Sequence, residues 1–524
     1  MSASFTSGSP QKVQLSVMKA GYGTGTVASS PVGIDCGASC AAQFATGTTV
    51  TLIPQADGGF FFDGWSGACS GTGACVVPIT AAASVTATFG GSLQSIKHII
   101  FMLQENRSFD QYLGHLPQYF QANPQYPMPA GGIDGEPANA SNPGLNGAAS
   151  VSAYRLDTAC VQNQSPFWNE SHRDFNLVDP TSSTATLDGF VTESANDALA
   201  NGYVDVQGAR SMGYYDWNEL PYYYFMAANF ATSDRWFSPV MDRTQPNRMY
   251  LLAATSAGHA YPLPPGTPPL NVPTIFDLLQ QHGISWKIYV ADLDRFSPPT
   301  QDSNLNMFVA SLKYPQNFVP SGQFFTDVAN NTLPAVAMIE PGFLAGLDEH
   351  PNVVANAVGG GVQRGSNFVS TLINALMGTP GSPSPSWKDS VFILTWDENG
   401  GFYDHVPPYQ TVPPDTVPPS DLQPTDICYH NPAPICGFNF TGFRVPSIVV
   451  SPFTRKGYVS HTKADYTAIL KLIETRFGLP SLTRRDAAQM DMTEFFDFAD
   501  APWLTPPSPP AQPANGACYL DHLP

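Results

Sequence analysis

Residues 98–104, HIIFMLQ, form an apolar run that ends directly in the polar sequence ENRSFD. Similar apolar runs follow along the chain, with helical patterns among them: SWKIYV (285–290), AVAMIE (335–340), VFILTW (391–396) and PSIVVS (446–451), with helices at 274–283 and 464–478. Strands that alternate with helices favour a largely parallel sheet with helices on both faces. We therefore predict an α/β fold whose ligand site lies at the carboxyl ends of the strands.

The residues before this region have a different pattern. Short β-type runs such as VQLSV, TTVTLIP and SVTATF alternate with turns rich in Gly, Ser and Thr. We predict a small all-β domain over 12–90, after a disordered N-terminus at 1–11, and a linker at 90–95, GGSLQS. An α/β domain over 96–503 follows, and residues 504–524 form a proline-rich tail that lies over the surface.

The composition excludes several classes of partner. Lys and Arg total 23 and Asp and Glu total 42, so the net charge of the 524-residue chain is −19. That sign is wrong for binding phosphate backbones by charge, and we expect no nucleic-acid partner. An apolar run long enough to span a bilayer, about 18 residues, is also missing from the sequence. Any contact with a membrane is therefore expected to be peripheral at most.

Cysteine usage indicates the compartment. The chain has eight cysteines, several in close pairs: Cys36, Cys40, Cys69, Cys75, Cys160, Cys428, Cys436 and Cys518. An even number in this arrangement is typical of disulfides formed in an oxidising environment. We predict a secreted or periplasmic protein, in which Cys518 pins the C-terminal tail.

Oxygen-bearing side chains follow two of the predicted strands. Glu105 and Asn106 come directly after 98–104, Asp397 and Glu398 follow 391–396, and Thr244 stands in DRTQPNR between them. Carboxylate, amide and hydroxyl oxygens suit a hard divalent cation. Each residue taken alone also has a structural reading, because Asn can cap a helix, Asp can fix a turn and Thr can bond its own backbone.

Five segments together resemble a known family: IKHIIFMLQENRSFDQYLG (96–114), DRTQPNRMYLLAAT (242–255), TWDENGGFYDHVPP (395–408), FRVPSIVVSPFTRKGYVSHT (443–462) and ILKLIETRFGLPSLTRRDA (469–487). They are similar to the phosphoesterases that include bacterial and plant non-specific phospholipases C and AcpA-type acid phosphatases. The resemblance runs from Ile96 to Pro502. It implies an alkaline-phosphatase-like α/β fold, one divalent metal ion, and a Ser or Thr nucleophile that takes up the phosphoryl group.

Carried over residue by residue, the resemblance implies a metal site made by Glu105, Asn106, Thr244, Asp397 and Glu398. Thr244 matches the nucleophile. A cation that binds its hydroxyl favours the alkoxide, which is the reactive form. The oxygen ligands leave Ca²⁺, Mg²⁺, Mn²⁺ and Zn²⁺ open as the metal.

The histidines and arginines near these motifs have two readings. The resemblance matches His172 and His350 to histidines that contact the phosphate, without deciding which is the general acid. His405 and His461 are equally compatible with a structural role. Arg107 and Arg248 suit either phosphate binding or a buried salt bridge. The sequence departs from the family before the nucleophile, where SPVMDRT stands in place of a Gly-Pro-Thr run.

The N-terminal region has a resemblance of its own. Residues 12–90, and FFFDGWSGACSGTGAC (60–75) above all, are similar to divergent internalin B repeats of bacterial surface proteins. Such modules space or attach other domains, or bind glycan. The resemblance therefore implies a contact of this domain with a cell surface or a glycan.

Taken together, these features predict a metal-dependent phosphoric ester hydrolase of phospholipase C type. It would cleave the phosphodiester of phospholipid headgroups through a covalent phosphothreonine. One alternative is an acid phosphatase that acts on small phosphomonoesters, since the same groups suffice for that reaction. The other is a surface-binding protein on a degenerate phosphoesterase scaffold, which retention of Thr244 and Asp397 disfavours. A sulfatase is disfavoured because the sequence has no Cys-x-Pro-x-Arg signature.

Overall fold

The computed structural model describes residues 11–58, 60–292, 305–351 and 361–524. The chain divides into two compact units, one made of residues 1–97 and 497–502 and the other of residues 98–496 and 503–524. The predicted disorder of residues 1–10 lies outside the described residues, and Gln11 is exposed coil.

The N-terminal unit is a small β-sandwich. One sheet has the strand order β3-β1-β7-β5 and the other β2-β4-β6. Alternate residues such as Leu15, Val50 and Val85 point inward and are fully buried, as the period of two requires. Two disulfides, Cys36–Cys40 and Cys69–Cys75, cross-link this unit. The strands are β1 (Lys12–Ala20), β2 (Gly25–Ser30), β3 (Ala41–Ala45), β4 (Thr49–Ala56), β5 (Phe60–Gly67), β6 (Cys75–Pro78) and β7 (Ala83–Gly91).

The second unit is built on an eight-stranded sheet with the order β16-β15-β17-β8-β20-β21-β13-β22. The first five strands are parallel to one another, and β21 runs antiparallel to both of its neighbours. The prediction of an α/β fold with a mostly parallel sheet is confirmed. The strands are β8 (His98–Gln104), β13 (Ala231–Ser233), β15 (Trp286–Val290), β16 (Phe318–Pro320), β17 (Val336–Glu340), β20 (Ser390–Trp396), β21 (Ser447–Val450) and β22 (Tyr458–Ser460).

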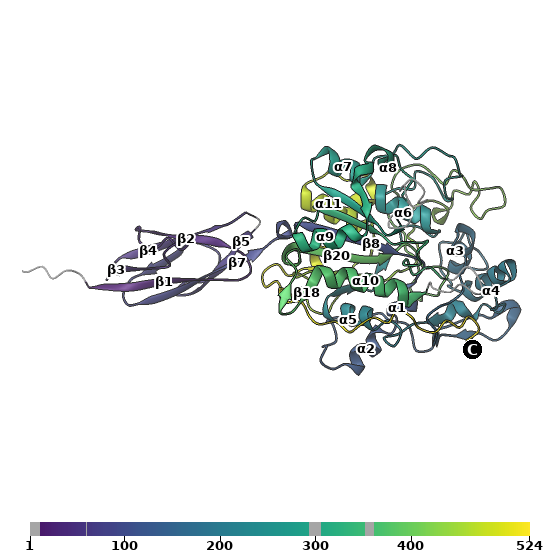
Figure 1. Cartoon of the computed structure of the whole chain (residues 1–524), viewed down its shortest axis with the longest axis horizontal. Helices are drawn as coiled ribbons and strands as arrows, with labels where there is room; N and C mark the ends of the chain where they lie inside the picture. Colours follow the sequence, from purple (N-terminus) through teal and green to yellow (C-terminus); the bar gives the residue numbers. More distant parts are fainter. Residues whose placement is uncertain (1–10, 59, 293–304, 352–360) are drawn as a thin grey trace, which may run out of the picture. The chain divides into compact units, whose positions relative to one another are not determined.

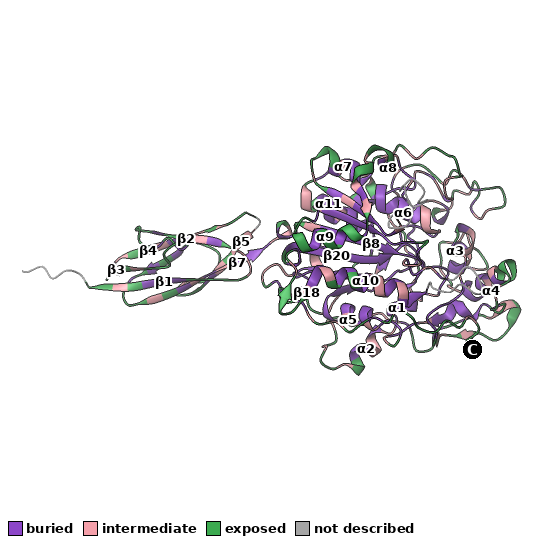
Figure 2. Ribbon diagram, viewed as in Figure 1, coloured by how far each residue is buried: buried purple, intermediate pink, exposed green. Residues whose placement is uncertain are grey.

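Helices cover both faces of this sheet. In Figure 1, α6, α7 and α11 lie above the central strands β8 and β20, and α5 and α10 lie below them. The inner strands are buried on both sides, as Figure 2 shows, which explains why their sequences are apolar without alternation. The helices are α1 (Phe109–Leu113), α2 (Leu116–Ala122), α3 (Trp168–Phe175), α4 (Phe190–Asn201), α5 (Pro221–Asn229), α6 (Thr244–Ala253), α7 (Ile275–Gln281), α8 (Ala310–Lys313), α9 (Gly322–Asn330), α10 (Val362–Met377), α11 (Ala468–Phe477) and α12 (Arg484–Ala487).

Short strands complete the unit, and one of them corrects a predicted boundary. The helix predicted over 464–478 begins only at Ala468, because Ala464–Asp465 form β23 and pair with β14 (Trp236–Phe237). The remaining pairs are β9 (Ser141–Asn142) with β10 (Val151–Ser152), β11 (Tyr154–Arg155) with β12 (Gly213–Tyr214), and β18 (Gly378–Thr379) with β19 (Ser382–Pro383).

The C-terminal tail is fastened to the second unit. Cys518 forms a disulfide with Cys160, and the carbonyl of Ala517 accepts a 2.7 Å hydrogen bond from the Ala159 amide. Gln512 is buried, and its side-chain amide donates to the carbonyl of Glu219 at 2.9 Å. With Cys428–Cys436 all eight cysteines are paired, as the sequence predicts.

Candidate active site

Three neighbouring parallel strands end in acidic segments. Glu105 and Asn106 follow β8, Asp348 follows β17, and Asp397 and Glu398 follow β20. The backbone amide of Asn106 donates to Asp397 Oδ1 at 3.0 Å, and the amide of Glu105 donates to the Asp348 carbonyl at 2.8 Å. Four of the five predicted metal ligands are thereby brought together at the carboxyl edge of the sheet. Asp348 was not among the predicted ligands.

The helix α6 crosses this edge and contributes Arg248. Its guanidinium lies 3.1 Å from Glu105 Oε1, 2.8 Å from both oxygens of Glu340 and 3.5 Å from Asp397 Oδ2. Of the two roles that the sequence suits for Arg248, the structure shows the buried salt bridge. Glu340 is the last residue of β17, so the strand-end rule that pointed to Glu105 and Asp397 could also have pointed to it.

Thr244 is the first residue of α6 and lies one helical turn before Arg248. Residues four apart lie on the same face of a helix, so Thr244 stands on the face that carries Arg248 toward the carboxylates. The turn before it, where the sequence departs from the family, is held by Asn247. Its side-chain amide donates to the carbonyls of Val240, Asp242 and Arg243 at 3.1, 2.7 and 3.2 Å.

Among the described residues, several oxygens of this cluster are buried without a hydrogen-bond partner. They are Asn106 Oδ1, Asp397 Oδ2, which has only its 3.5 Å ion pair with Arg248, and Glu398 Oε1, on residues that are 2%, 0% and 1% exposed. Buried polar atoms are nearly always satisfied, so a group of such orphaned oxygens fits the binding of a cation. The donor set is all oxygen and converges from two strand ends, which fits a hard divalent cation.

The electrostatics agree with that fit. Burial and the nearby charge of Glu105 raise the pKa of Asp397 to about 7. Burial and the charge of Asp397 raise the pKa of Glu398 well above its usual range. Arg248 offsets only part of this repulsion. A divalent cation would hold both carboxyl groups ionised, because it supplies the positive charge that the site lacks.

His350 lies beside the cluster. Its Nδ1 is 2.7 Å from the Pro351 carbonyl, and its backbone amide donates to Asp348 Oδ1 at 3.2 Å. Because a carbonyl only accepts, Nδ1 carries the proton and Nε2 has the lone pair. Burial lowers the pKa of His350, while the charge of Asp397 acts to raise it. The neutral ring therefore has a proton-accepting nitrogen within electrostatic reach of Asp397.

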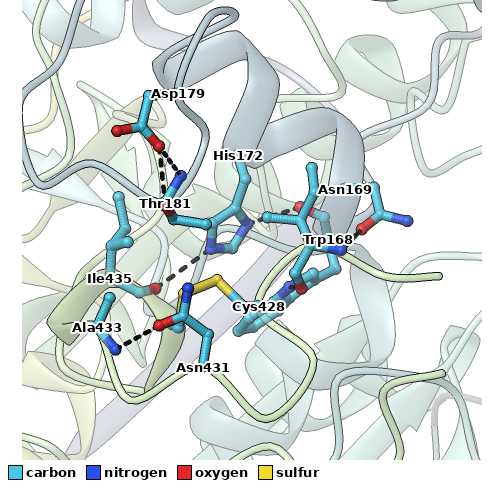
Figure 3. The surroundings of a disulfide bond; sticks show 11 residues. Trp168, Asn169, His172, Asp179, Thr181, Cys428, Asn431, Ala433 and Ile435 are labelled. Carbon is cyan, nitrogen blue, oxygen red and sulfur yellow. Dashed lines mark hydrogen bonds between the residues drawn. A yellow bond between two sulfur atoms is a disulfide. The ribbon is translucent and has the colours of Figure 1, made fainter. Parts of the chain in front are cut away.

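His172 has other partners. Its Nδ1 lies 2.6 Å from the Trp168 carbonyl and its Nε2 3.2 Å from the Ile435 carbonyl, as Figure 3 shows. The ring also packs against the Trp168 indole, with centroids 4.4 Å apart. With both nitrogens facing backbone carbonyls, His172 ties α3 to the loop of the Cys428–Cys436 disulfide. It has no nitrogen left for a phosphate oxygen in this conformation, and we leave it out of the proposed machinery.

A second polar network surrounds His405. Asp110, Asp404 and His405 place three potential ligand atoms close enough together to hold a metal ion. Arg444 already supplies a cation there, with Nη2 2.8 Å from Asp110 Oδ1 and Nε 2.9 Å from Asp404 Oδ1. His405 itself is 2.7 Å from Asp110 Oδ2. We therefore assign this network a structural role and place no metal in it.

The other two residues with alternative readings also have protein partners. His461 Nδ1 lies 2.9 Å from Asp234 Oδ1, which favours the structural reading for this half-exposed side chain. Arg107 donates through Nη2 to the Glu349 carbonyl, and its Nη1 lies 3.5 Å from Gln111 Oε1. Arg107 is fully buried, so it supports the loop after β8 rather than reaching a ligand at the surface.

Comparisons with known proteins show the family of this chain. The phosphoesterase family model matches residues 96–480, and the divergent InlB B-repeat domain matches residues 17–92. Phospholipase C B of Mycobacterium tuberculosis is 31% identical over 456 residues, covering 79% of this chain and 80% of that protein. Non-specific phospholipase C1 of Arabidopsis thaliana is 30% identical over 437 residues, covering 78% and 72%.

The solved structures that match are more distant. An alkaline phosphatase superfamily protein from Vibrio parahaemolyticus has a TM-score of 0.32 and 10% identity, covering 68% of this chain and 74% of that chain. Among the described residues, no helix has the length and apolar character that a bilayer crossing requires.

Proposed function

The chain belongs to the phosphoesterase family, and we propose that it hydrolyses phosphodiesters in the manner of a phospholipase C. The observation that carries the proposal is the group of orphaned oxygens on Asn106, Asp397 and Glu398 beside the helix that begins with Thr244. Its relatives named phospholipase C cover about four fifths of this chain. The proposed substrate is a phospholipid headgroup ester or a small phosphate ester.

The proposed metal ligands are Glu105, Asn106, Thr244, Asp397 and Glu398. A divalent cation bound there would favour the ionised hydroxyl of Thr244 and offset negative charge on the phosphate. Thr244 stands at the N-terminus of a ten-residue helix, whose partial positive charge favours a bound phosphate group. The positive charge of Arg248 reduces the repulsion between the carboxylates. Its ion pairs with Glu105 and Glu340 fix α6 against the ends of β8 and β17.

We propose that Thr244 Oγ1 attacks phosphorus as its proton passes to Nε2 of His350, which then gives it to the leaving alcohol. The bond between phosphorus and the glycerol oxygen breaks, and the alcohol departs with a proton. His350 is the proposed proton carrier, because its neutral ring has a free lone pair at Nε2. Water then cleaves the phosphothreonine, which returns the hydroxyl to Thr244 and releases the phosphorylated headgroup.

The test compares wild type with Thr244→Ala on phosphatidylcholine vesicles and on p-nitrophenyl phosphorylcholine, each with and without a chelator. We expect a loss of at least a thousandfold in kcat from the substitution and a similar loss on chelation. Thr371→Ala, at an exposed position of α10, is the matched control and should keep full activity. Turnover that survives Thr244→Ala undiminished would refute the assignment of the nucleophile.

We further propose that the protein works outside the cytoplasm, since all eight cysteines form disulfides. Its N-terminal unit, which matches a repeat domain, is proposed to attach the enzyme to a cell surface or a glycan. Contact with the lipid substrate would then be peripheral.

A further inference from the structure

The residue before the proposed nucleophile is an arginine held between aromatic rings. The guanidinium carbon of Arg243 lies 3.3 Å from the ring centre of Phe167 and 5.1 Å from that of Tyr261. Its nearest carboxylate oxygen, Asp242 Oδ1, is 3.9 Å from Nε and already accepts the Arg243 backbone amide at 2.8 Å. Nε is buried and makes no hydrogen bond to a described residue. Arg243 thus carries a charge whose hydrogen-bonding capacity the described part of the chain leaves largely unused.

The two rings are held in place by their own contacts. The Tyr261 hydroxyl donates to Asp426 Oδ2 at 2.8 Å, and Asn169 Nδ2 donates to Asp426 Oδ1 at 2.9 Å. Asn169 lies on α3, and Phe167 is the residue directly before that helix. Asp426 therefore links Tyr261 to the helix that follows Phe167. We call Phe167 and Tyr261 together the clamp, and the Arg243 guanidinium stacks on rings that these contacts hold in place.

The side chain of Arg243 remains accessible at 17% exposure, and Phe167 is 40% exposed. Aromatic faces that are open to solvent are the usual site for a quaternary ammonium group such as choline. Here the protein fills them with its own cation. A choline headgroup could not stack on these rings, because Arg243 already covers them, and the positive charge of Arg243 would repel it.

We propose that Arg243 selects substrates by charge, binding a second anionic oxygen on the phosphorus beside Thr244. This rests on the proposed function and ranks its substrates: of the phospholipid headgroup esters and small phosphate esters proposed above, those with an additional negative charge are preferred over zwitterionic choline esters. A planar guanidinium presents paired N–H donors that match two phosphate oxygens, and its stacking on Phe167 and Tyr261 fixes that plane.

The first test is a ratio of specificity constants. kcat/KM is measured for p-nitrophenyl phosphate and for p-nitrophenyl phosphorylcholine, in wild type, Arg243→Gln and Arg243→Lys. We expect the ratio of the first to the second to fall at least tenfold in Arg243→Gln and less in Arg243→Lys, which keeps the charge but not the plane. Arg455→Gln is the control, because Arg455 also stacks on a ring, that of Tyr458, but donates to the carbonyl of Phe496.

The second test needs no turnover. Inorganic phosphate and phosphocholine are titrated by calorimetry into Thr244→Ala and into Thr244→Ala with Arg243→Gln, in the presence of Mg²⁺. We expect phosphate to bind at least tenfold more weakly without Arg243, and phosphocholine to change less than threefold.

The outcomes separate the two proposals. If wild type turns over neither ester but phosphate binding depends on Arg243, the charge selection stands and the phospholipase proposal fails. If the enzyme is active and neither the ratio nor the phosphate affinity changes in a folded Arg243→Gln or Arg243→Lys protein, the charge selection is overturned.

Discussion

At the scale of single residues, Asn106 shows how tightly the proposed metal site is built. It adopts a left-handed conformation, with φ of 63°; its backbone amide donates to Asp397, and its side-chain oxygen is buried without a hydrogen-bond partner among the described residues. Gly400 makes this possible, because a β-carbon there would lie 2.5 Å from the Asn106 carbonyl oxygen. The Gly400 amide also donates to Glu398. One glycine therefore supports two proposed ligands.

We predict that Gly400→Ala weakens metal binding at least tenfold, because it displaces Asn106 and Glu398 together. The left-handed conformation of alanine, with φ of 65°, should also cost about 1–2 kcal/mol in unfolding free energy. Gly478→Ala is a matched control, since Gly478 has the same φ of 65° but open space at its β-carbon. It should lose similar stability and keep its metal affinity. Calorimetric titration with Mg²⁺ or Ca²⁺ measures the difference.

The residues that sequence patterns located are those that directly follow apolar strands. Glu105, Asn106, Asp397 and Glu398 meet because their strands are neighbours in the sheet. The spacing of residues in the sequence could not predict the contacts of His172. Its two carbonyl partners come from its own helix and from a loop more than 260 residues away. Its burial against a disulfide is a tertiary property.

At the scale of secondary structure elements, one ionic network joins segments that are far apart in sequence. It links Asp110 on α1, Asp404 and His405 after β20, and Arg444 before β21. Burial alone would lower the pKa of His405, but the hydrogen bond with Asp110 and the charges of Asp110 and Asp404 raise it to about 9, against the effect of Arg444. Asp134 also faces the ring, 3.2 Å from Nε2. Protonated His405 thus stabilises the folded state.

The pH dependence follows from the direction of this shift. A histidine with a pKa of about 9 in the folded state and about 6.5 in the unfolded state stabilises the protein fully below pH 6.5. That stabilisation, about 3 kcal/mol, is lost as the pH rises from 6.5 through 9. Urea unfolding at both ends of this range should show the loss in wild type and a smaller one in His405→Gln. If His405→Gln loses as much unfolding free energy between these two pH values as wild type does, His405 does not carry the effect. His282→Gln, at an exposed position after α7, is the control.

Local patterns predicted the start of a helix only where that start depends on neighbouring residues. The helix α7 has a capping box of Thr274 and Asp277 that is readable from sequence. The start of α11 is not, because Ala464–Asp465 pair with Trp236–Phe237, more than 220 residues away. Long-range pairing here overrides a local helical pattern.

At the scale of the whole molecule, the longest covalent link is the disulfide between Cys160 and Cys518, which are 358 residues apart. It holds the tail beside Ala159, whose carbonyl accepts the amide of Val362, the first residue of α10. The number of cysteines pointed to disulfides, but the pairing of two distant cysteines depends on the fold and could not be read from spacing.

A disulfide stabilises a protein mainly by restricting its unfolded chain, and the effect grows with the logarithm of the loop length. Cys160–Cys518 should therefore contribute about 3 kcal/mol more to the unfolding free energy than Cys428–Cys436, whose cysteines are eight residues apart. Urea unfolding of the two double Cys→Ser variants measures this difference. A larger loss in the Cys428–Cys436 variant would mean that the packing of its loop on His172 and Trp168 outweighs chain entropy, and that this loop holds the unit together more firmly than the tail does.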